Sequence, residues 1–314
     1  MENAPKPLPA GDASPSNESL GSARPLHQRS TACQGEDAPA NVQQALQAAS
    51  ALGLQRLDAQ LLLLQALGRA AHDRAWLLAH DTDPLSEAVG RQFMALARRR
   101  AAGEPVAYLT GHREFFGLDL QVDARVLIPR PDTETLVEWA LQAMSGLRGA
   151  LVLDLGTGSG AIALALRHSR PDLQVSAVDA SADALAVARA NAARLGLAVE
   201  FLQGSWLNGL RGPYDLIAAN PPYVAEDDPH LAALAYEPRQ ALTAGPDGLD
   251  DLRAIVAAAP GCLRPGGWLL LEHGWDQAVQ VRAWLAQRGF TAVASRRDLG
   301  GIERCSGGQW PAMK

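Results

Sequence analysis

Apolar residues recur every three or four positions between residues 41 and 110, as in the segment NVQQALQAASALGLQRLDAQLLLLQALG. This spacing gives each helix one apolar face, and Gly53 and Gly68 mark breaks between helices. Pro84 precedes a further periodic run, at a position typical of a helix start. We therefore predict a small helical domain over residues 41–112.

The pattern changes to period two in FFGLDLQVDARVLIPRPDTE, residues 115–134. Alternation of this kind indicates strands that bury one face. A turn near Val122, Asp123 and Ala124 would divide the segment, so we expect a β-hairpin linker over residues 113–130.

The rest of the chain, residues 131–314, alternates short apolar runs with amphipathic segments. Strands separated by helices indicate an α/β fold in which a mostly parallel sheet is covered on both faces. The apolar runs predict strands at residues 151–156, 174–179, 199–204, 214–220, 266–274 and 290–296.

Composition narrows the class of protein. Residues 1–40 are rich in Pro, Ser, Gly, Asn and Gln and cannot bury enough surface to offset chain entropy, so we expect a disordered extension. The net charge of −6 argues against a general nucleic-acid binder. Cys33, Cys262 and Cys305 fit neither a disulfide framework nor a zinc site, so we expect a cytoplasmic protein without a metal. Since no apolar run reaches the ~18 residues of a membrane span, we expect no membrane association.

The segment LVLDLGTGSGAIALAL ends a strand in a glycine loop and opens directly into a helix. Gly156, Gly158 and Gly160 allow a tight turn and close approach to a ligand, and the helix N-terminus supplies free N–H groups. Asp179 ends the following strand, where a carboxylate can accept both hydroxyls of a ribose. These features predict a cofactor that carries a nucleoside.

Two kinds of cofactor fit the loop. Residues 156–161 satisfy G-x-G-x-x-A, the dinucleotide fingerprint, so a nicotinamide dehydrogenase is one alternative. Asp154 before the first glycine and the compact G-x-G-x-G favour S-adenosylmethionine.

The segment YDLIAANPPYV runs from a buried strand into a stiff corner. The two prolines donate no N–H group, so they end the ladder and leave carbonyl oxygens pointing outward. In an open α/β sheet, this edge near the switch point of the strand order is where ligands bind. The Asn220 side-chain oxygen and the Pro221 carbonyl can hold the hydrogens of a flat NH2 group, and Tyr223 can stack on it. The corner predicts methylation of a planar nitrogen, with adenine, guanine and glutamine as candidate acceptors.

Segments spread over most of the chain carry a resemblance to a known family: LTGHREFFGL, VLIPRPDTETLVEWAL, VLDLGTGSGAIALAL, NPPYVAEDDPHL, YEPRQAL and LLLEHGW. From about residue 45 to its end, the chain resembles the release-factor glutamine methyltransferases, the PrmC/HemK family. The resemblance implies a Rossmann-like class I methyltransferase fold with a seven-stranded sheet. It further implies S-adenosylmethionine-dependent methylation of the glutamine in the Gly-Gly-Gln motif of peptide chain release factors, with the helical domain helping to hold the release factor.

The resemblance also assigns roles by position. It implies that the cofactor is bound by Gly156, Thr157, Gly158, Ser159, Gly160, Asp179, Trp206 and Asn220. Asp179 would contact the ribose, and Trp206 would lie near the adenine. The glutamine amide would be held by Asn220, Pro221, Pro222 and Tyr223, of which Asn220, Pro221 and Tyr223 would be catalytic. The family commonly has an acidic residue before the tryptophan. Here Ser205 takes that place, so an adenine-edge contact is either missing or made through water.

Two rival functions remain. A nucleic-acid N-methyltransferase would use the same corner on a base, but it would need a basic groove, so we expect no direct nucleic-acid binding. A translation-associated binding protein without activity is disfavoured by the intact Asn220 corner.

The linker segment IPRPDTE holds three further candidates. Arg130, Thr133 and Glu134 either line the site, or belong to an interdomain linker in which Asp132 or Thr133 caps the next helix.

Other polar positions have simpler interpretations. Glu272 and His273 are expected to form a hydrogen-bonded structural pair rather than to hold a catalytic histidine, and Glu237 and Arg239 to form a supporting salt bridge. Gly-Gly-Gln recurs at residues 307–309, which raises self-methylation of Gln309 as a hypothesis.

Overall fold

The computed structural model describes residues 38–312, so most of the extension predicted over residues 1–40 lies outside the described residues. The first elements are helices: α1 (Val42–Ala51), α2 (Arg56–Ala66), α3 (Arg74–Ala79), α4 (Glu87–Ala101) and α5 (Val106–Thr110). They enclose a core of their own that includes Leu62, Leu63 and Phe93. The helix expected at Pro84 starts at Glu87, because Ser86 caps it by accepting the N–H of Val89 at 3.3 Å.

The predicted hairpin is present, but its turn lies earlier than expected. Strands β1 (His112–Phe115) and β2 (Leu118–Gln121) pair antiparallel across the two residues Phe116 and Gly117. Both turn residues have positive φ, +51° and +76°, as tight two-residue hairpins require. The prediction of a turn near residues 122–124 is therefore wrong. The period-two pattern runs through both strands, and only Gly117 marks the reversal.

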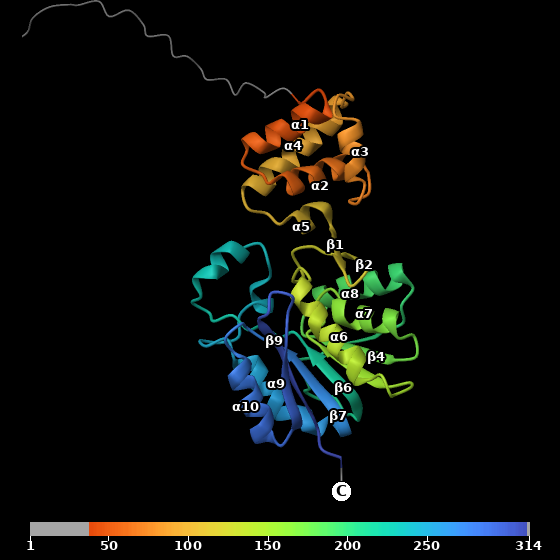
Figure 1. The fold of residues 1–314 in the computed structure, drawn as a ribbon, viewed down its shortest axis with the longest axis vertical. Helices are drawn as coiled ribbons and strands as arrows, with labels where there is room; N and C mark the ends of the chain where they lie inside the picture. Colours follow the sequence, from red (N-terminus) through yellow and green to blue (C-terminus); the bar gives the residue numbers. More distant parts are fainter. Residues whose placement is uncertain (1–37, 313–314) are drawn as a thin grey trace, which may run out of the picture. The chain divides into compact units, whose positions relative to one another are not determined.

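A seven-stranded sheet flanked by helices follows the hairpin and confirms the expected α/β fold (Figure 1). Its strands are β3 (Leu151–Leu155), β4 (Gln174–Asp179), β5 (Glu200–Gln203), β6 (Tyr214–Ala219), β7 (Leu263–Glu272), β8 (Thr291–Arg297) and β9 (Glu303–Gln309). The order is β5-β4-β3-β6-β7-β9-β8, with β9 antiparallel to both neighbours. The chain order reverses between β3 and β6, so the switch point lies where the glycine loop and the Asn220 corner leave the sheet.

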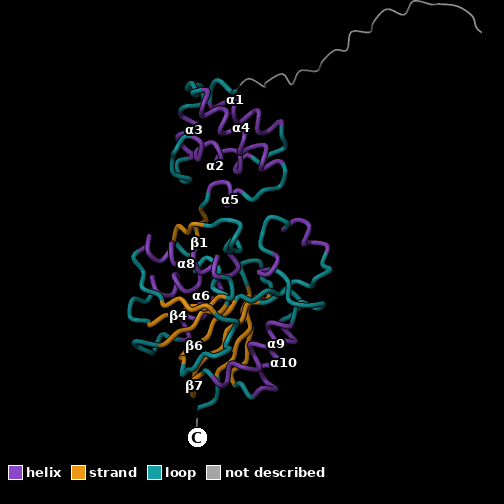
Figure 2. Tube along the Cα trace, turned by 180° about the vertical axis from the view of Figure 1, so that it is seen from behind, coloured by secondary structure: helices purple, strands orange, loops and turns teal. Residues whose placement is uncertain are grey.

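Helices cover both faces of this sheet, as Figure 2 shows from behind. On one face lie α6 (Glu134–Ala143), α7 (Ala161–Ser169) and α8 (Ala182–Leu195); on the other lie α9 (Asp250–Ala258) and α10 (Ala278–Arg288). Short 3-10 helices complete the chain: η1 (Pro131–Thr133), η2 (Pro229–Leu234), η3 (Arg239–Ala241) and η4 (Ala259–Gly261). Successive strand residues enter opposite cores: Leu216 and Ala218 pack under α6, whereas Ile217 and Ala219 pack under α9.

The Gly-Gly-Gln segment near the C-terminus belongs to β9, the strand that the apolar pattern missed. A Cβ at Gly307 would approach the Leu270 side chain at 2.5 Å, and one at Gly308 would approach Phe290 at 2.9 Å. The Gln309 side chain donates to the Gly266 carbonyl at 2.8 Å. Gly266 lies near the start of β7, so Gln309 is at the opposite end of the strands from the site. Close packing in the sheet accounts for this tripeptide, and the geometry gives self-methylation no support.

Candidate functional site

The glycine loop turns sharply between β3 and α7. Gly156, Gly158 and Gly160 have φ of +69°, +55° and +86°, a backbone conformation that residues with a side chain rarely adopt. The Trp206 ring lies against the first of these glycines, since a Cβ at Gly156 would meet its Cζ3 at 3.1 Å. At Gly160 a Cβ would meet Leu164 at 3.0 Å. Gly156 and Gly160 are therefore needed both for the backbone conformation and for their close neighbours, whereas Gly158 is needed for its conformation alone.

Several N–H groups of the loop are bonded within the protein. Gly156 and Thr157 donate to the Val178 carbonyl at 2.8 and 3.0 Å, and Gly158 donates to the Asp179 carboxylate at 2.9 Å. These three donors lie in the loop before the helix start, and the end of β4 beside them accepts their hydrogens. At the helix start, Gly160 donates to the Thr157 carbonyl at 2.8 Å and Ala163 donates to Asp154 at 3.2 Å, whereas Ala161 and Ile162 have no acceptor among residues 38–312.

Asp154 forms hydrogen bonds to the loop and to the first turn of α7. It is fully buried, and its Oδ2 accepts from the Thr157 hydroxyl at 2.6 Å and from the Ala163 N–H at 3.2 Å. Its Oδ1 has no hydrogen-bond partner among residues 38–312. Burial raises the pKa of Asp154 to about 7, although both hydrogen bonds lower it. Ser159 is also buried, and its carbonyl accepts from the side chain of Asn191 on α8 at 3.0 Å.

Asp179 lies where the ribose contact is predicted. Its two oxygens accept the N–H groups of Gly158 and Ser181, both at 2.9 Å. Each carboxylate oxygen keeps a further lone pair, so the group can still accept hydroxyl hydrogens.

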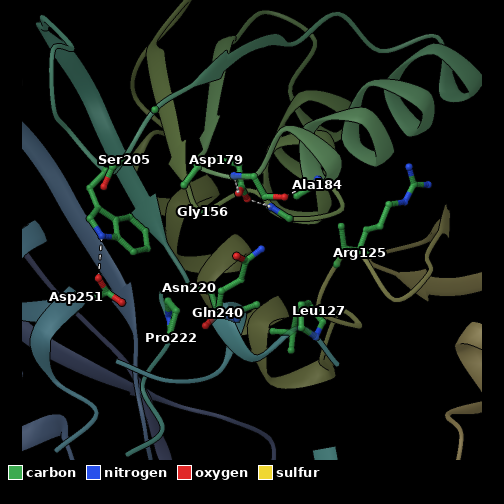
Figure 3. Close-up of a pocket in the computed structure, with 18 residues that line it drawn as sticks. Arg125, Leu127, Gly156, Asp179, Ala184, Ser205, Asn220, Pro222, Gln240 and Asp251 are labelled. Carbon is green, nitrogen blue, oxygen red and sulfur yellow. Dashed lines mark hydrogen bonds between the residues drawn. The ribbon is translucent and has the colours of Figure 1, made fainter. Parts of the chain in front are cut away.

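A cavity of about 250 Å³ lies in front of the loop (Figure 3). Six of the predicted site residues line it: Gly156, Gly158, Asp179, Trp206, Asn220 and Pro222. Five others are not part of its lining: Thr157, Ser159, Gly160, Pro221 and Tyr223.

An acidic side chain that sequence reasoning missed reaches the tryptophan wall of the cavity. The Trp206 Nε1 donates to the Asp251 Oδ1 at 2.8 Å (Figure 3). Asp251 lies in the first turn of α9 and lines the cavity together with Ser205. Burial raises the pKa of Asp251, and the Trp206 bond lowers it. No local motif marks Asp251, because the packing of α9 on the sheet brings it here.

The charge of the cavity distinguishes between cofactors. Its charged lining consists of Asp179, Asp251 and Arg125, and Arg125 is paired with Asp123 at 2.6 Å. A wall with excess negative charge suits a cationic sulfonium and opposes a pyrophosphate. The residues present therefore fit S-adenosylmethionine better than a dinucleotide.

Asn220 projects from the end of β6 into the cavity (Figure 3). Its Nδ2 donates to the Thr133 Oγ1 at 3.2 Å. Within the described part of the chain, no donor bonds the Asn220 Oδ1 or the Pro221 carbonyl oxygen. The Asn220 acceptor thus remains available in the cavity, whereas Pro221 is buried and does not line it.

The other residues of the corner are more enclosed. Pro221 is buried, and the Tyr223 carbonyl accepts from the Gln277 side chain at 3.0 Å. Burial raises the pKa of Tyr223 far above its usual value, so its hydroxyl stays protonated.

The sequence left open whether Thr133 and Glu134 line the site or belong to the linker, and the two residues differ in this respect. Thr133 makes no capping bond and instead meets Asn220, whereas Glu134 accepts the Phe116 N–H at 3.1 Å and supports the hairpin.

Arg130 pairs with Glu237, which also accepts the Ile128 N–H at 3.1 Å. Arg239 donates instead to the Glu226 carbonyl at 2.9 Å, so the predicted Glu237–Arg239 salt bridge is wrong. Glu237 therefore bonds two residues of the linker rather than a residue of its own loop.

His273 has a structural environment. Its Nδ1 lies 2.9 Å from the Gly274 carbonyl and its Nε2 lies 2.8 Å from the Ser306 hydroxyl, so both ring nitrogens are engaged within the protein. Burial lowers its pKa, which favours the neutral ring. These contacts agree with a structural rather than a catalytic role, but they join His273 to Gly274 and Ser306, so the predicted hydrogen-bonded pair of Glu272 and His273 is wrong.

Comparisons with known proteins agree with the geometry. The Methyltransferase small domain family matches residues 132–245, and the PrmC N-terminal domain family matches residues 37–111. None of the helices within residues 38–312 combines the length and apolar character needed to cross a bilayer. The catalytic domain of hMettl16, solved with the MAT2A 3'UTR hairpin 6, shares the fold at a TM-score of 0.53 and 18% identity, over 70% of this chain and 82% of that one.

Two relatives cover most of the chain, and both are named release factor glutamine methyltransferase. The Bordetella pertussis protein is 55% identical over 82% of this chain and 95% of its own length. The Xylella fastidiosa (strain Temecula1) protein is 51% identical over 86% of this chain and 98% of its own length. The chain therefore belongs to the release factor glutamine methyltransferase family.

Proposed function

We propose that this protein transfers a methyl group from S-adenosylmethionine to the side-chain nitrogen of the glutamine in the Gly-Gly-Gln motif of peptide chain release factors. The observation that carries the proposal is the Asn220 carboxamide, whose nitrogen is held by Thr133 while its oxygen is left as an acceptor in the cavity. The family relationship supports the choice of glutamine over a nucleic-acid base.

The cofactor would be held by the glycine loop, by Asp179 on the ribose and by Trp206 near the adenine. When bound, S-adenosylmethionine supplies an electrophilic methyl group on a sulfonium. The Asp251 carboxylate would complete the adenine side, where Ser205 offers no charge. The carboxylates around the cavity would favour the positive charge of the cofactor.

The acceptor nitrogen presents the chemical difficulty, because its lone pair is delocalised into the amide. The Asn220 Oδ1 and the Pro221 carbonyl would accept its two hydrogens and fix its orientation. These oxygens would also stabilise the positive charge that develops on the nitrogen. Pro222 and Tyr223 would bound the flat amide, and holding the reacting atoms at about 3–3.5 Å removes much of the entropic barrier. No strong base is needed, since the nitrogen becomes acidic only once it has bonded to the methyl group.

The partner would be the release factor itself, held in part by the helical domain of residues 41–112. The extension is assigned to residues 1–40, the hairpin linker to residues 113–130 and the catalytic domain to residues 131–314. This function requires a cytoplasmic protein that needs neither a membrane nor direct binding of nucleic acid.

The test is methyl transfer from radiolabelled S-adenosylmethionine to a purified release factor. We expect label on the wild-type release factor and none on a variant whose Gly-Gly-Gln glutamine is replaced by alanine. Total RNA and genomic DNA serve as control acceptors. Label on either nucleic acid but not on the release factor would refute the proposal.

A further inference from the structure

The Asn220 corner has a polar layer behind it that the proposed function does not use. Ala218 pairs with Leu270 in the register of β6 and β7, and both pack under α6. Two residues further on, Asn220 and Glu272 leave the sheet on the same face, because alternate residues of a strand share a face. Thr133 lies at the start of α6 on that face, so three segments far apart in sequence meet there.

With Glu272 ionised, the hydrogen-bond donors and acceptors in this layer can be matched in only one direction. Glu272 is 1% exposed, and Thr133 lowers the pKa of its carboxyl group by acting as a hydrogen-bond donor towards it. A carboxylate only accepts, so the Thr133 hydroxyl must donate to it and keeps only its oxygen for another partner. That oxygen can receive only a donor, which selects the Nδ2 of Asn220, observed at 3.2 Å. The Asn220 Oδ1 is thereby turned towards the cavity.

The direction of this chain is unambiguous for the ionised carboxylate of Glu272, and it persists in the neutral acid when the proton lies on the Oε2. Burial raises the pKa of Glu272 to about 7; Asp132 raises it further, while Arg304 and the hydrogen bonds from Thr133 and Tyr223 lower it. The Oε2 has no partner within residues 38–312, so a proton taken up there leaves the other oxygen able to accept. Cys305, its register neighbour on β9, is a buried thiol whose own pKa is raised well above the usual value, so it adds no charge.

We propose that Thr133 and Glu272 are positioning residues for methyl transfer, which act by fixing the Asn220 carboxamide with its oxygen towards the acceptor nitrogen. This inference rests on the proposed function and adds the origin of the orientation of the clamp. The residues act through Asn220 and touch neither substrate nor cofactor.

The first test compares Thr133→Val, which keeps the shape of the side chain but removes the hydroxyl, with Thr133→Ser, which keeps the hydroxyl. We expect kcat on the release factor to fall by about 10–100-fold in the valine variant, the loss typical of removing a partner that orients a functional group. The KM for the release factor and the Kd for S-adenosylmethionine should change by less than about threefold, since neither ligand loses a contact. The serine variant should restore most of kcat. Thr291→Val, at the opposite edge of the sheet, makes the same chemical change and should leave kcat unchanged.

A second pair tests the other end of the chain and remains informative if Thr133→Val folds poorly. Glu272→Gln keeps an acceptor oxygen for Thr133 and should retain kcat within about threefold, with the same pH profile as the wild type. Glu272→Leu removes the acceptor and should match Thr133→Val in kcat. Wild-type kcat in Thr133→Val, or an equal loss in the valine and serine variants, would overturn the inference. A wild-type enzyme that does not label the release factor would instead refute the proposed function, so the two failures are distinguishable.

Discussion

The glycine corner and the Asn220 corner of the site both place a threonine hydroxyl on a buried carboxylate. At the glycine corner, Asp154 accepts from Thr157 at 2.6 Å, and both belong to one strand–loop–helix unit. At the Asn220 corner, Thr133 and Glu272 act on Asn220 from the start of α6 and the end of β7. The first arrangement is local in sequence, and the second forms only when the whole sheet and α6 are in place.

This difference separates the two halves of the proposed reaction. A local loop keeps its shape as long as its own residues are intact, so cofactor binding should depend on few positions. The acceptor side depends on contacts between distant segments, and small displacements there matter because transfer requires alignment of the reacting atoms. Substitutions at the Asn220 corner should therefore lower kcat, whereas substitutions at the glycine corner should weaken cofactor binding.

The largest effect is expected for Asn220→Ala. Removing the acceptor oxygen should lower kcat by roughly 10²–10³-fold, as for other groups that stabilise developing charge. S-adenosylmethionine should still bind, though more weakly, in isothermal titration calorimetry. Asn208→Ala removes an exposed asparagine and should leave both quantities unchanged. Wild-type turnover in Asn220→Ala would refute the clamp.

The next effect concerns the tryptophan wall at the glycine corner. Gly156→Ala and Gly158→Ala both place a side chain at positive φ and should each cost about 1–2 kcal/mol in the free energy of unfolding. Only at Gly156 does the new Cβ meet Trp206, whereas nothing lies within 4 Å of one at Gly158. The Kd for S-adenosylmethionine should therefore rise about tenfold more in Gly156→Ala, a difference of about 1.4 kcal/mol. Equal Kd values in the two variants would show that the ring has no part in cofactor binding.

A smaller effect is expected for Asp251→Ala. The substitution removes the acceptor that holds the Trp206 indole at 2.8 Å and one of the two carboxylates in the cavity lining. Loss of one such hydrogen bond, about 1 kcal/mol, predicts a roughly fivefold rise in the Kd for the cofactor. Asp250→Ala removes the neighbouring carboxylate, which is exposed and paired with Arg253, and serves as the control. An unchanged Kd in Asp251→Ala would show that this carboxylate does not contribute to cofactor binding.

The same distinction between local and distant contacts explains which features could be predicted from the sequence alone. The strand pattern, the glycine loop and Asp179 could be predicted because each depends on spacing within one short segment. Asp251 and Glu272 could not, since their partners are chosen by the packing of α9 and β7. The position of the hairpin turn was missed for the opposite reason, because one local glycine, Gly117, outweighs a long alternating pattern. Strand β9 was missed because its two glycines break the apolar pattern, although the close packing of the sheet requires glycine at both positions.

The smallest effect expected is on the pH dependence of the free energy of unfolding, and it has the same direction at the two corners. Burial raises the pKa values of Asp154 and Glu272 to about 7, above those of the unfolded chain. Between pH 5 and pH 7 the folded protein therefore holds more protons than the unfolded one, and the free energy of unfolding falls as the pH rises. In Asp154→Asn this decline should become shallower by about 1 kcal/mol per pH unit in urea titrations. Asp172→Asn is the control, because Asp172 is exposed and Arg170 lowers its pKa, so its titration lies below this range. An unchanged slope in Asp154→Asn would mean that its carboxyl group is already ionised at pH 5, and that the glycine corner rests on a buried charge rather than on a neutral acid.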